Sequence, residues 1–492
     1  MVVRRPSPSG YVNGIIDVDY THDVIVIGGG AAGLTAAGGC AMFGLKVALI
    51  EGHRMGGECL NNGCVPSKAL IASARRAAEA RQHKRAGVEL AAGQVDWMGV
   101  RDHVHAAIAA IAPHDSAERF EEMGCEVIQD WARLTGPKSV EVGGRTLTAP
   151  RIVIATGSGP LVPPIPGLDG VPYLTNETLF ELTEQPGHLV IIGGGVIGME
   201  MGQSFRRLGS DVTIINPGPL MGRDDRDSVA LLVQRMEEEG VRFVNGKAEG
   251  VEGGDGSVTV TTDGGERIAG THLLLAVGRK PRTTGFGLEE IGIETGRGGI
   301  VTDKRRRTNL KHIYAIGDCR DGPRLTHVSG YEGSNVVLEI ALGLPAKVDY
   351  RALPWCTYTF PEIAQIGMTE EDAREKYGDA LTVVTEGFDH NERAIAEGED
   401  SYHPKGHCKV MLKGKKVVGA SICGTYAGEL LLPFTQLITG KTGTFAMGGA
   451  IIAYPTRSEI TKAAAFSAWE PTVFGAWPKR WVSLLAKLRR AF

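Results

Sequence analysis

Cysteine is scarce in this sequence, and long apolar runs and an excess of charge of either sign are missing. The 492 residues include only 8 cysteines, too few for a fold held together by disulfides. No run of about 18 or more apolar residues occurs, so we expect no membrane-spanning helix. The net charge of -4 gives no sign of a nucleic-acid-binding protein.

The start of the chain also lacks the apolar stretch of a secretory signal. Residues 1–23 contain two arginines but no apolar run of the required length. We therefore expect a cytoplasmic, reducing location, where two neighbouring cysteines indicate redox or metal chemistry rather than a structural disulfide. Hydrophobic content of 42% and charged content of 22% are typical of a globular chain, here long enough for about three domains.

Glycine, by contrast, is abundant, with 68 residues gathered in short clusters after apolar runs. Residues 23–33 and 188–198 each read as a strand, a tight turn and the start of a helix. Further strands are expected at 46–51 and 151–157 for the first unit, at 211–216 and 272–278 for the second, and at 313–318. The sequence thus predicts an α/β fold with two Rossmann-like dinucleotide-binding domains.

The first glycine cluster has the spacing of a dinucleotide-binding loop. In GxGxxG, Gly28 allows the turn, Gly30 lets the backbone approach a pyrophosphate, and Gly33 lets helix and strand pack closely. The helix N-terminus then faces the phosphates. Glu51 ends the next strand, where an acid can bind a ribose hydroxyl.

The second cluster, Gly193, Gly195 and Gly198, repeats this spacing, but Asn216 takes the position of the acid. An acid there favours NAD, and arginines favour NADP. Asn216 is neither, and Arg223 could reach a phosphate or could be an ordinary solvated charge. The choice between NADH and NADPH therefore stays open.

Cys59 and Cys64 lie in the segment 56–68. In a regular helix, Cα atoms five residues apart are about 8–9 Å apart, and a disulfide needs about 4.4–6.8 Å. The intervening residues 61–63 (Asn-Asn-Gly) can distort the first turn, and a helix N-terminus stabilises a thiolate. The pair therefore indicates a switchable dithiol; the alternatives are two unrelated buried cysteines or a metal site. We predict no metal site, because His53 is the only further ligand in the segment.

The segment GGECLNNGCVPSK resembles the redox motif of the class I, FAD-dependent pyridine nucleotide–disulfide oxidoreductases, which include dihydrolipoamide dehydrogenase, glutathione reductase and mercuric reductase. The resemblance covers about residues 22–465. It implies FAD in the first fold, NADH or NADPH in the second, and a homodimer whose partner subunit completes the active site. The α+β dimerisation domain includes a hairpin expected over 409–422.

The resemblance also implies roles by position. Cys64 would be the charge-transfer thiolate beside the flavin, and Cys59 the exchange thiol that meets the substrate. Lys68 and Glu200 would be the charge pair beside flavin N5, although a surface ion pair is the ordinary alternative. Asp318 would bind the ribityl chain. The other implied contacts are Gly57, Thr156, Gly157, Gly317 and His327 for FAD, and Val196 and Gly278 for NAD(P).

The resulting division of the chain has five parts. They are an N-terminal extension (1–21), an FAD domain (22–165 and 286–349), an NAD(P) domain (166–285), a dimerisation domain (350–465) and a basic tail (466–492). The tail places Trp481, Leu484, Leu485, Leu488 and Phe492 on one helical face and adds Lys479, Arg480, Lys487, Arg489 and Arg490. This composition indicates an interfacial helix with peripheral membrane contact, or a helix packed on the dimer.

One position departs from the family pattern. Most disulfide-reducing members carry a His-Pro-Thr…Glu motif whose histidine acts as acid–base for the exchange thiol. Here Tyr454 replaces the histidine, Glu459 is retained, and no histidine follows His407. A phenol titrates near pH ~10, so it is a poor base at neutral pH but can donate a hydrogen bond. Tyr454 could equally be a packing residue at the dimer interface.

Mercuric reductases also have a tyrosine there, and residues 111–120 and 355–362 resemble that branch. Those enzymes pass the ion through a vicinal cysteine pair at the extreme C-terminus, whereas the last cysteine here is Cys423, and we expect no N-terminal metal-binding domain. Our main expectation is reduction of a small-molecule or protein disulfide, or a related thiol substrate, as in dihydrolipoamide dehydrogenase. The alternatives are reduction of a soft metal ion such as Hg(II), and membrane-peripheral, diaphorase-type electron transfer to a quinone or protein.

Overall fold

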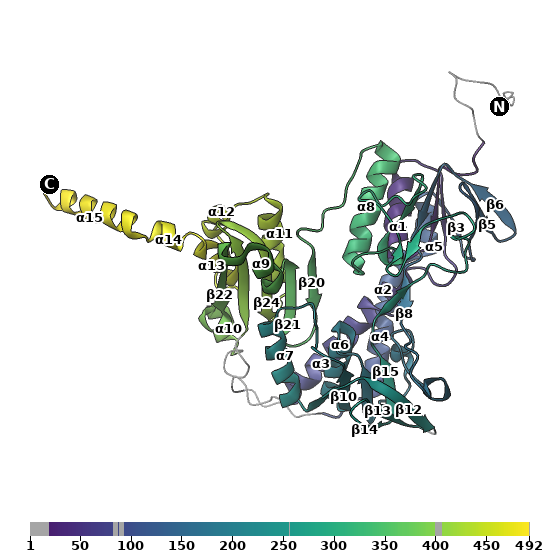
Figure 1. Cartoon of the computed structure of the whole chain (residues 1–492), viewed down its shortest axis with the longest axis horizontal. Coiled ribbons are helices and arrows are strands. Elements are labelled where there is room, and N and C mark those ends of the chain that lie inside the picture. Colours follow the sequence, from purple (N-terminus) through teal and green to yellow (C-terminus); the bar gives the residue numbers. More distant parts are fainter. Residues whose placement is uncertain (1–18, 82–86, 88–92, 255, 399–405, 492) are drawn as a thin grey trace, which may run out of the picture. The chain divides into compact units, whose positions relative to one another are not determined.

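The computed structural model describes residues 19–81, 87, 93–254, 256–398 and 406–491 (Figure 1). Most of the predicted N-terminal extension, 1–21, lies outside these residues, as does Phe492. The chain divides into two compact units: the first is Met1–Asn61, Ile108–Gly159 and Arg279–Val348, and the second is Asn62–Ala107, Pro160–Gly278 and Asp349–Phe492. Within the described ranges, no helix is both long and apolar enough to cross a membrane.

The first unit is built on a parallel five-stranded sheet of order β19-β7-β1-β2-β3. The strands are β1 (Val24–Ile27), β2 (Val47–Ile50), β3 (Cys125–Ile128), β7 (Arg151–Ile154) and β19 (Ile313–Ala315). All four residues of β1 are buried, because both faces of a parallel sheet are covered. Helices α1 (Ala31–Met42) and α8 (Thr326–Leu342) pack against each other in the core cluster that contains Val24 and Val26.

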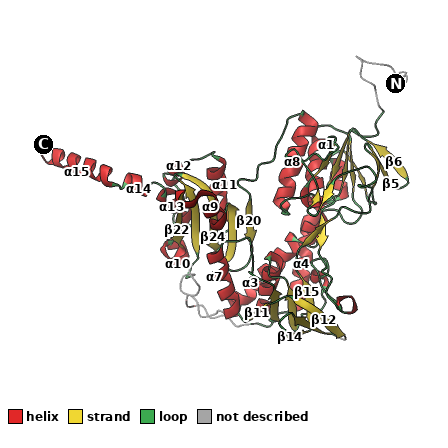
Figure 2. Ribbon diagram, viewed as in Figure 1, coloured by secondary structure: helices red, strands yellow, loops and turns green. Residues whose placement is uncertain are grey.

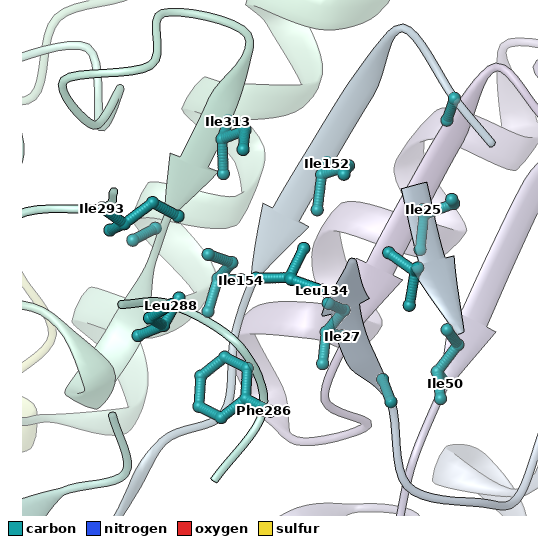
Figure 3. Close-up of a cluster of buried hydrophobic side chains, with 14 of the residues drawn as sticks. Ile25, Ile27, Ile50, Leu134, Ile152, Ile154, Phe286, Leu288, Ile293 and Ile313 are labelled. Carbon is teal, nitrogen blue, oxygen red and sulfur yellow. The ribbon is translucent and has the colours of Figure 1, made fainter. Parts of the chain in front are cut away.

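The opposite face of this sheet forms a second core. Ile25 and Ile27 point into it because successive strand residues alternate between faces. Figure 3 shows them with Ile50, Ile152 and Ile154, facing Leu134 and Phe286. Leu134 comes from a small antiparallel sheet of β4 (Arg133–Gly136), β5 (Ser139–Val142) and β6 (Arg145–Thr148).

The second unit repeats the plan with a parallel sheet of order β11-β10-β9-β15. Its strands are β9 (His188–Ile192), β10 (Asp211–Asn216), β11 (Val241–Asn245) and β15 (His272–Leu275). Helix α6 (Val196–Leu208) follows β9 and packs against α3 (Cys64–Arg81). An antiparallel sheet of β12 (Ala248–Gly254), β13 (Ser257–Thr262) and β14 (Arg267–Gly270) completes the core. The strands predicted for both glycine-marked units are therefore confirmed.

The C-terminal part of the second unit has a different architecture, an antiparallel sheet of order β20-β21-β24-β23-β22. The strands are β20 (Pro354–Thr357), β21 (Glu362–Gly367), β22 (Leu381–Gly387), β23 (His407–Lys413) and β24 (Lys416–Gly424). The hairpin expected over 409–422 is β23–β24, which closes at Lys413 and Lys416. Helices α11 (Leu432–Thr439) and α13 (Glu459–Ser467) cover its core. The mixture of helices and strands in Figure 2 is the α/β fold with an added α+β domain that the sequence predicts.

Further helices and strands lie between and after these sheets. The remaining helices are α2 (Gly57–Asn61), α4 (Trp97–Ile111), α5 (Ala117–Glu122), α7 (Arg226–Glu238), α9 (Glu370–Tyr377), α10 (Glu392–Ala396), α12 (Thr444–Gly448), α14 (Glu470–Val473) and α15 (Ala476–Ala491). The remaining strands are β8 (Ser158–Pro160), β16 (Arg279–Pro281), β17 (Thr295–Gly296) and β18 (Gly299–Ile300). Helix α15 confirms the helix predicted for the tail.

A buried carboxylate fixes the turn that follows β19. Glu332 of α8 is fully buried, and its Oε2 accepts hydrogen bonds from the Gly317 backbone N–H and the Arg320 Nε, both at 2.8 Å. Its Oε1 pairs with the guanidinium groups of Arg320 and Arg306. Because Arg320 is also buried, neither charge can be left without the other. This network holds the turn that carries Asp318.

We expect Glu332→Gln to lower the free energy of unfolding by about 3 kcal/mol, because it removes the negative charge that pairs with the buried Arg320 guanidinium. Urea unfolding of the FAD-loaded protein measures the change. The control is Glu290→Gln, which breaks a half-exposed ion pair with Arg133 and should cost less than about 1 kcal/mol. Equal losses in the two variants would contradict the role of the Glu332 network.

Candidate functional site

The first glycine of each loop lies where no side chain fits. Gly28 and Gly193 have φ of 113° and 115°, a left-handed conformation that favours glycine. A Cβ on Gly28 would lie 2.3 Å from the Ala155 carbonyl oxygen, and one on Gly193 would lie 2.4 Å from that of Ala276. Each loop therefore crosses directly over the end of a neighbouring strand.

The third glycine of each loop brings its helix against the turn. A Cβ on Gly33 would lie 1.8 Å from the Gly28 oxygen, and one on Gly198 would lie 1.9 Å from the Gly193 oxygen. Nothing lies within 4 Å of a Cβ built on Gly195, the middle glycine of the second loop. Helices α1 and α6 begin directly after the middle glycines, and no side chain caps either of them. The N–H groups at the start of each helix are uncapped, and the glycines beside them have no side chain to block a ligand. This arrangement fits the pyrophosphates of FAD and NAD(P).

The acid position shows how the two sites differ. Glu51 Oε2 accepts a hydrogen bond from the Gly29 backbone N–H at 2.6 Å, and Oε1 accepts one from the His53 N–H at 2.7 Å. Asn216 takes the same place in the second loop, where its Oδ1 accepts from the Gly194 N–H at 2.9 Å. A carboxylate only accepts hydrogen bonds, whereas an amide also donates. The second site thus keeps the geometry of the first and loses its negative charge.

The cysteine segment folds as the end of one short helix, α2, and the start of a second helix, α3, rather than as one continuous helix. Cys59 lies in α2, and Asn61 closes that helix by donating hydrogen bonds from Nδ2 to the carbonyls of Gly57 (2.7 Å) and Met55 (3.1 Å). Helix α3 begins anew at Cys64, without an acidic residue in its first turn. The predicted distortion at residues 61–63 is therefore present. Cys59 is half-buried and Cys64 is exposed.

The other cysteines are chemically different from this pair. Burial raises the pKa of every one of their thiols: to about 12 for Cys40, to about 11 for Cys125 and Cys319, and strongly for Cys356, Cys408 and Cys423. A protonated thiol is a poor nucleophile and metal ligand. These six side chains are thus suited to packing rather than to redox exchange.

Lys68 and Glu200 are brought together as predicted. The Lys68 Nζ lies 3.0 Å from Glu200 Oε2, with the glutamate buried and the lysine partly exposed. Glu200 Oε1 also accepts a hydrogen bond from the Tyr358 backbone N–H at 2.8 Å. The Tyr358 ring lies below the ammonium, with its centroid 4.4 Å from Nζ. Tyr358 therefore fixes both members of the pair; it lies in the segment 355–362, but no role at the site was predicted for it from the sequence.

Asp318 lies at the end of β19 within a polar network. Its Oδ2 accepts a hydrogen bond from Ser158 Oγ at 2.7 Å and lies 3.5 Å from Arg279 Nε. Burial raises the pKa of the Asp318 carboxyl, and the Ser158 hydrogen bond and the Arg279 charge oppose that shift. Arg279 also forms a bidentate pair with Glu58, the residue before Cys59. Ser158 and Arg279 lie in no motif that would have marked them in the sequence, and Glu58 lies in the redox motif but was given no role there.

The remaining predicted FAD positions all lie in the first unit. Gly57 lies against the first glycine loop, where its Cβ would be 2.6 Å from the Gly30 Cα. Thr156 and Gly157 bind the backbone of Arg282 at 2.7 and 2.9 Å. Gly317 has a φ of 71°, and His327 is exposed in the first turn of α8.

The two remaining NAD(P) positions lie in the second unit. Val196 is the exposed first residue of α6. Gly278 has a φ of 135°, and its carbonyl accepts a hydrogen bond from the Leu161 N–H at 3.0 Å. Val196 therefore follows the end of β9, and Gly278 follows the end of β15, the strand beside β9 in the sheet.

Tyr454 is 69% exposed, and its phenol donates a hydrogen bond to Glu392 at the start of α10. This hydrogen bond raises the pKa of the phenol above its ordinary value. Glu459 instead accepts a hydrogen bond from the Thr456 backbone N–H at 3.3 Å. Helix α10 is tied to this loop by Asn391, whose Nδ2 donates to the Thr456 carbonyl at 3.1 Å. Glu392 is therefore the acceptor for Tyr454, and no motif in the sequence marks it.

Comparison with known proteins relates these features to a family. The family model described as pyridine nucleotide-disulphide oxidoreductase matches residues 22–333, and the model of that family's dimerisation domain matches residues 353–465. A mercuric reductase from Bacillus cereus is 35% identical over 428 residues, which cover 85% of this chain and 67% of the relative. A dihydrolipoyl dehydrogenase from Bacillus subtilis is 34% identical over 463 residues, covering 91% of this chain and 97% of the relative.

A solved structure has the same fold. It is the Cu(II) complex of the HOCl-induced flavoprotein disulfide reductase RclA from Escherichia coli, with a TM-score of 0.79 at 29% identity, covering 89% of this chain and 98% of that chain. The match to the dimerisation domain supports a homodimer. The chain belongs to the pyridine nucleotide–disulphide oxidoreductases, and it is an FAD-dependent enzyme that uses NADH or NADPH.

Proposed function

We propose that this enzyme uses NADH or NADPH to reduce a disulfide, or a related thiol substrate, through Cys59 and Cys64. The contrast among its eight cysteines carries the proposal. Cys64 is exposed and Cys59 is partly exposed at an interrupted helix start, whereas five of the other six cysteines are buried, and the sixth, Cys356, is partly buried with a raised thiol pKa. An accessible thiolate is what thiol–disulfide exchange requires.

The chain's own residues account for the exchange step. FAD, when bound, takes hydride from the nicotinamide and supplies the electron pair that reduces the two cysteines. The Cys59 thiolate attacks one sulfur of the substrate disulfide and expels the other as a thiolate, which gives a mixed disulfide. Cys64 then attacks the Cys59 sulfur, so that the Cys59–Cys64 disulfide forms and the second substrate thiol leaves. The dithiol has lost two electrons, and the expelled thiolates take protons from water.

The other residues of the site have supporting roles in this proposal. Lys68 holds a positive charge next to the flavin, and Glu200 keeps the ammonium in place. Asp318 binds the ribityl chain from the turn that Glu332 fixes. The first glycine loop with Glu51 binds FAD, the second with Asn216 binds NAD(P)H, and the remaining positions predicted for each cofactor contribute to the same two sites. Because each glycine loop is assigned to one cofactor, we also propose the division predicted from the sequence into an FAD domain, an NAD(P) domain and a dimerisation domain.

A soft metal ion such as Hg(II) is the second candidate substrate. Tyr454 favours it, because the hydrogen bond to Glu392 keeps the phenol protonated and unsuited to act as a base. An ion held by two thiolates can accept electrons without a proton transfer at Cys59, whereas disulfide exchange gains from an acid–base group. The similar proteins include mercuric reductases, and the RclA structure is a Cu(II) complex.

The second glycine loop gives a test of the NAD(P)H site. Gly198→Ala places a Cβ 1.9 Å from the Gly193 oxygen, so we expect a lower melting temperature and loss of NAD(P)H binding. Gly195→Ala meets no atom within 4 Å, so its melting temperature should stay unchanged. Its added methyl group should still raise the Kd for NADH and NADPH at least about tenfold, because the backbone can no longer approach the pyrophosphate. Unchanged binding by Gly195→Ala would place the nucleotide elsewhere.

The Tyr454 phenol should not titrate between about pH 6 and 9, because its ordinary pKa near ~10 is raised further by Glu392. The pH profiles of disulfide reduction by the wild type and by Tyr454→Phe should therefore have the same shape over this range. Tyr454→His should add a titration near pH ~6.5 and raise disulfide turnover about tenfold or more. A pH profile that changes shape in Tyr454→Phe would show that the phenol does act as an acid or base.

Steady-state oxidation of NADH and NADPH with lipoamide, glutathione disulfide, Hg(II) or a quinone would separate the candidate substrates. Cys59→Ala should abolish turnover with the first three and spare much of the quinone reduction, which needs only the flavin. The control is Cys125→Ala, which removes a buried thiol and should leave all four rates near those of the wild type. Lipoamide and Hg(II) turnover that survives in Cys59→Ala would refute electron transfer through the cysteine pair.

A further inference from the structure

The C-terminal helix α15 presents a continuous apolar face to solvent. Trp477, Trp481, Leu484, Leu485 and Leu488 follow one another at helical spacing, so they lie on one side of the helix. Trp477 is 74% exposed, and Trp481 and Leu488 are each 50% exposed. None of residues 476–490 is buried. Large apolar side chains exposed in a continuous stripe usually mark an interaction surface.

The rest of the same helix carries charge of one sign. Its basic residues are Lys479, Arg480, Lys487, Arg489 and Arg490, and residues 476–491 contain no Asp or Glu. The helix thus has five positive charges in a chain whose net charge is -4. At about 100° per residue, these basic side chains lie on both flanks of the apolar stripe and on the face opposite to it.

We propose that α15 binds the surface of a bilayer that contains anionic lipids. The helix would lie in the plane of the interface, with its apolar stripe below the headgroups and its basic side chains against the lipid phosphates. Charge complementarity favours a lipid surface over a second copy of this chain. The five basic side chains of α15 fit a surface with a high density of negative charge, whereas the whole chain has a net charge of only -4.

The two tryptophans support this orientation. The rings of Trp477 and Trp481 stack with their centroids 6.3 Å apart and nearly parallel planes, so the two aromatic side chains lie together on the apolar stripe. Tryptophan prefers the headgroup level of a bilayer because its ring is apolar while its indole N–H can stay hydrated. The helix has too few apolar residues to span the bilayer, and none of the helices among the described residues is long and apolar enough to do so. This inference goes beyond the proposed function and does not depend on the substrate.

Co-sedimentation of the FAD-loaded enzyme with lipid vesicles tests the proposal. The wild type should bind vesicles of phosphatidylcholine with about 30 mol% phosphatidylglycerol, and bind pure phosphatidylcholine vesicles far less. Added salt should weaken the binding, since surface charges are screened. Replacing Arg489 and Arg490 by glutamine should lower the binding constant about fivefold per charge removed.

A matched pair of variants separates insertion of the apolar face from charge attraction alone. Leu488→Glu and Ser483→Glu add the same charge to the same helix, one within the apolar stripe and one on the polar face. Leu488→Glu should abolish binding, whereas Ser483→Glu should reduce it only about fivefold. Equal losses would contradict the buried apolar face.

Deletion of residues 476–492 completes the test. The truncated enzyme should lose vesicle binding but keep its dimeric mass and its rate of NAD(P)H oxidation. If the wild type fails to bind anionic vesicles, or if the deletion dissociates the dimer, the helix is a subunit contact and the proposal is wrong.

Discussion

In each nucleotide-binding unit, a helix begins so close to the strand before it that only glycine backbone fits between them. The Cβ positions of Gly33 and Gly198 would fall within 2 Å of a carbonyl oxygen of their own turn. No side chain caps the N–H groups at the start of α1 or α6. The close approach also brings the side chain at the end of the next strand within hydrogen-bonding distance of the loop, as seen for Glu51 and Asn216. Both cofactor sites depend on this one steric condition.

Ion pairs hold several residues of the candidate site in place. Three charges near the candidate site have fixed partners: the buried Glu332 pairs with Arg320, the buried Glu200 with Lys68, and the partly buried Glu58 with Arg279. An ion pair out of water is stable only when both members stay in place. These pairs therefore act as rigid links, which position the Asp318 turn, the Lys68 ammonium and the residue next to Cys59.

The sequence predicted those parts of the fold that depend on local pattern. The apolar run of β1, the two glycine loops and the hairpin β23–β24 each lie within a short segment, so spacing alone identifies them. The partners of Arg279 and Tyr454 could not be predicted in this way. Glu58 lies 221 residues from Arg279, and Glu392 lies 62 residues from Tyr454. Only the folded chain brings such residues together.

The uneven burial of the cysteines has a consequence for how the protein can be oxidised. Eight cysteines allow on the order of a hundred complete pairings, and a chain with eight reactive thiols could be trapped in many of them. Here five thiols are buried, a sixth, Cys356, is partly buried, and burial raises the pKa of all six. Under the proposed function, oxidation then concentrates on one pair, whose two covalent states are Cys59 and Cys64 joined, or both reduced.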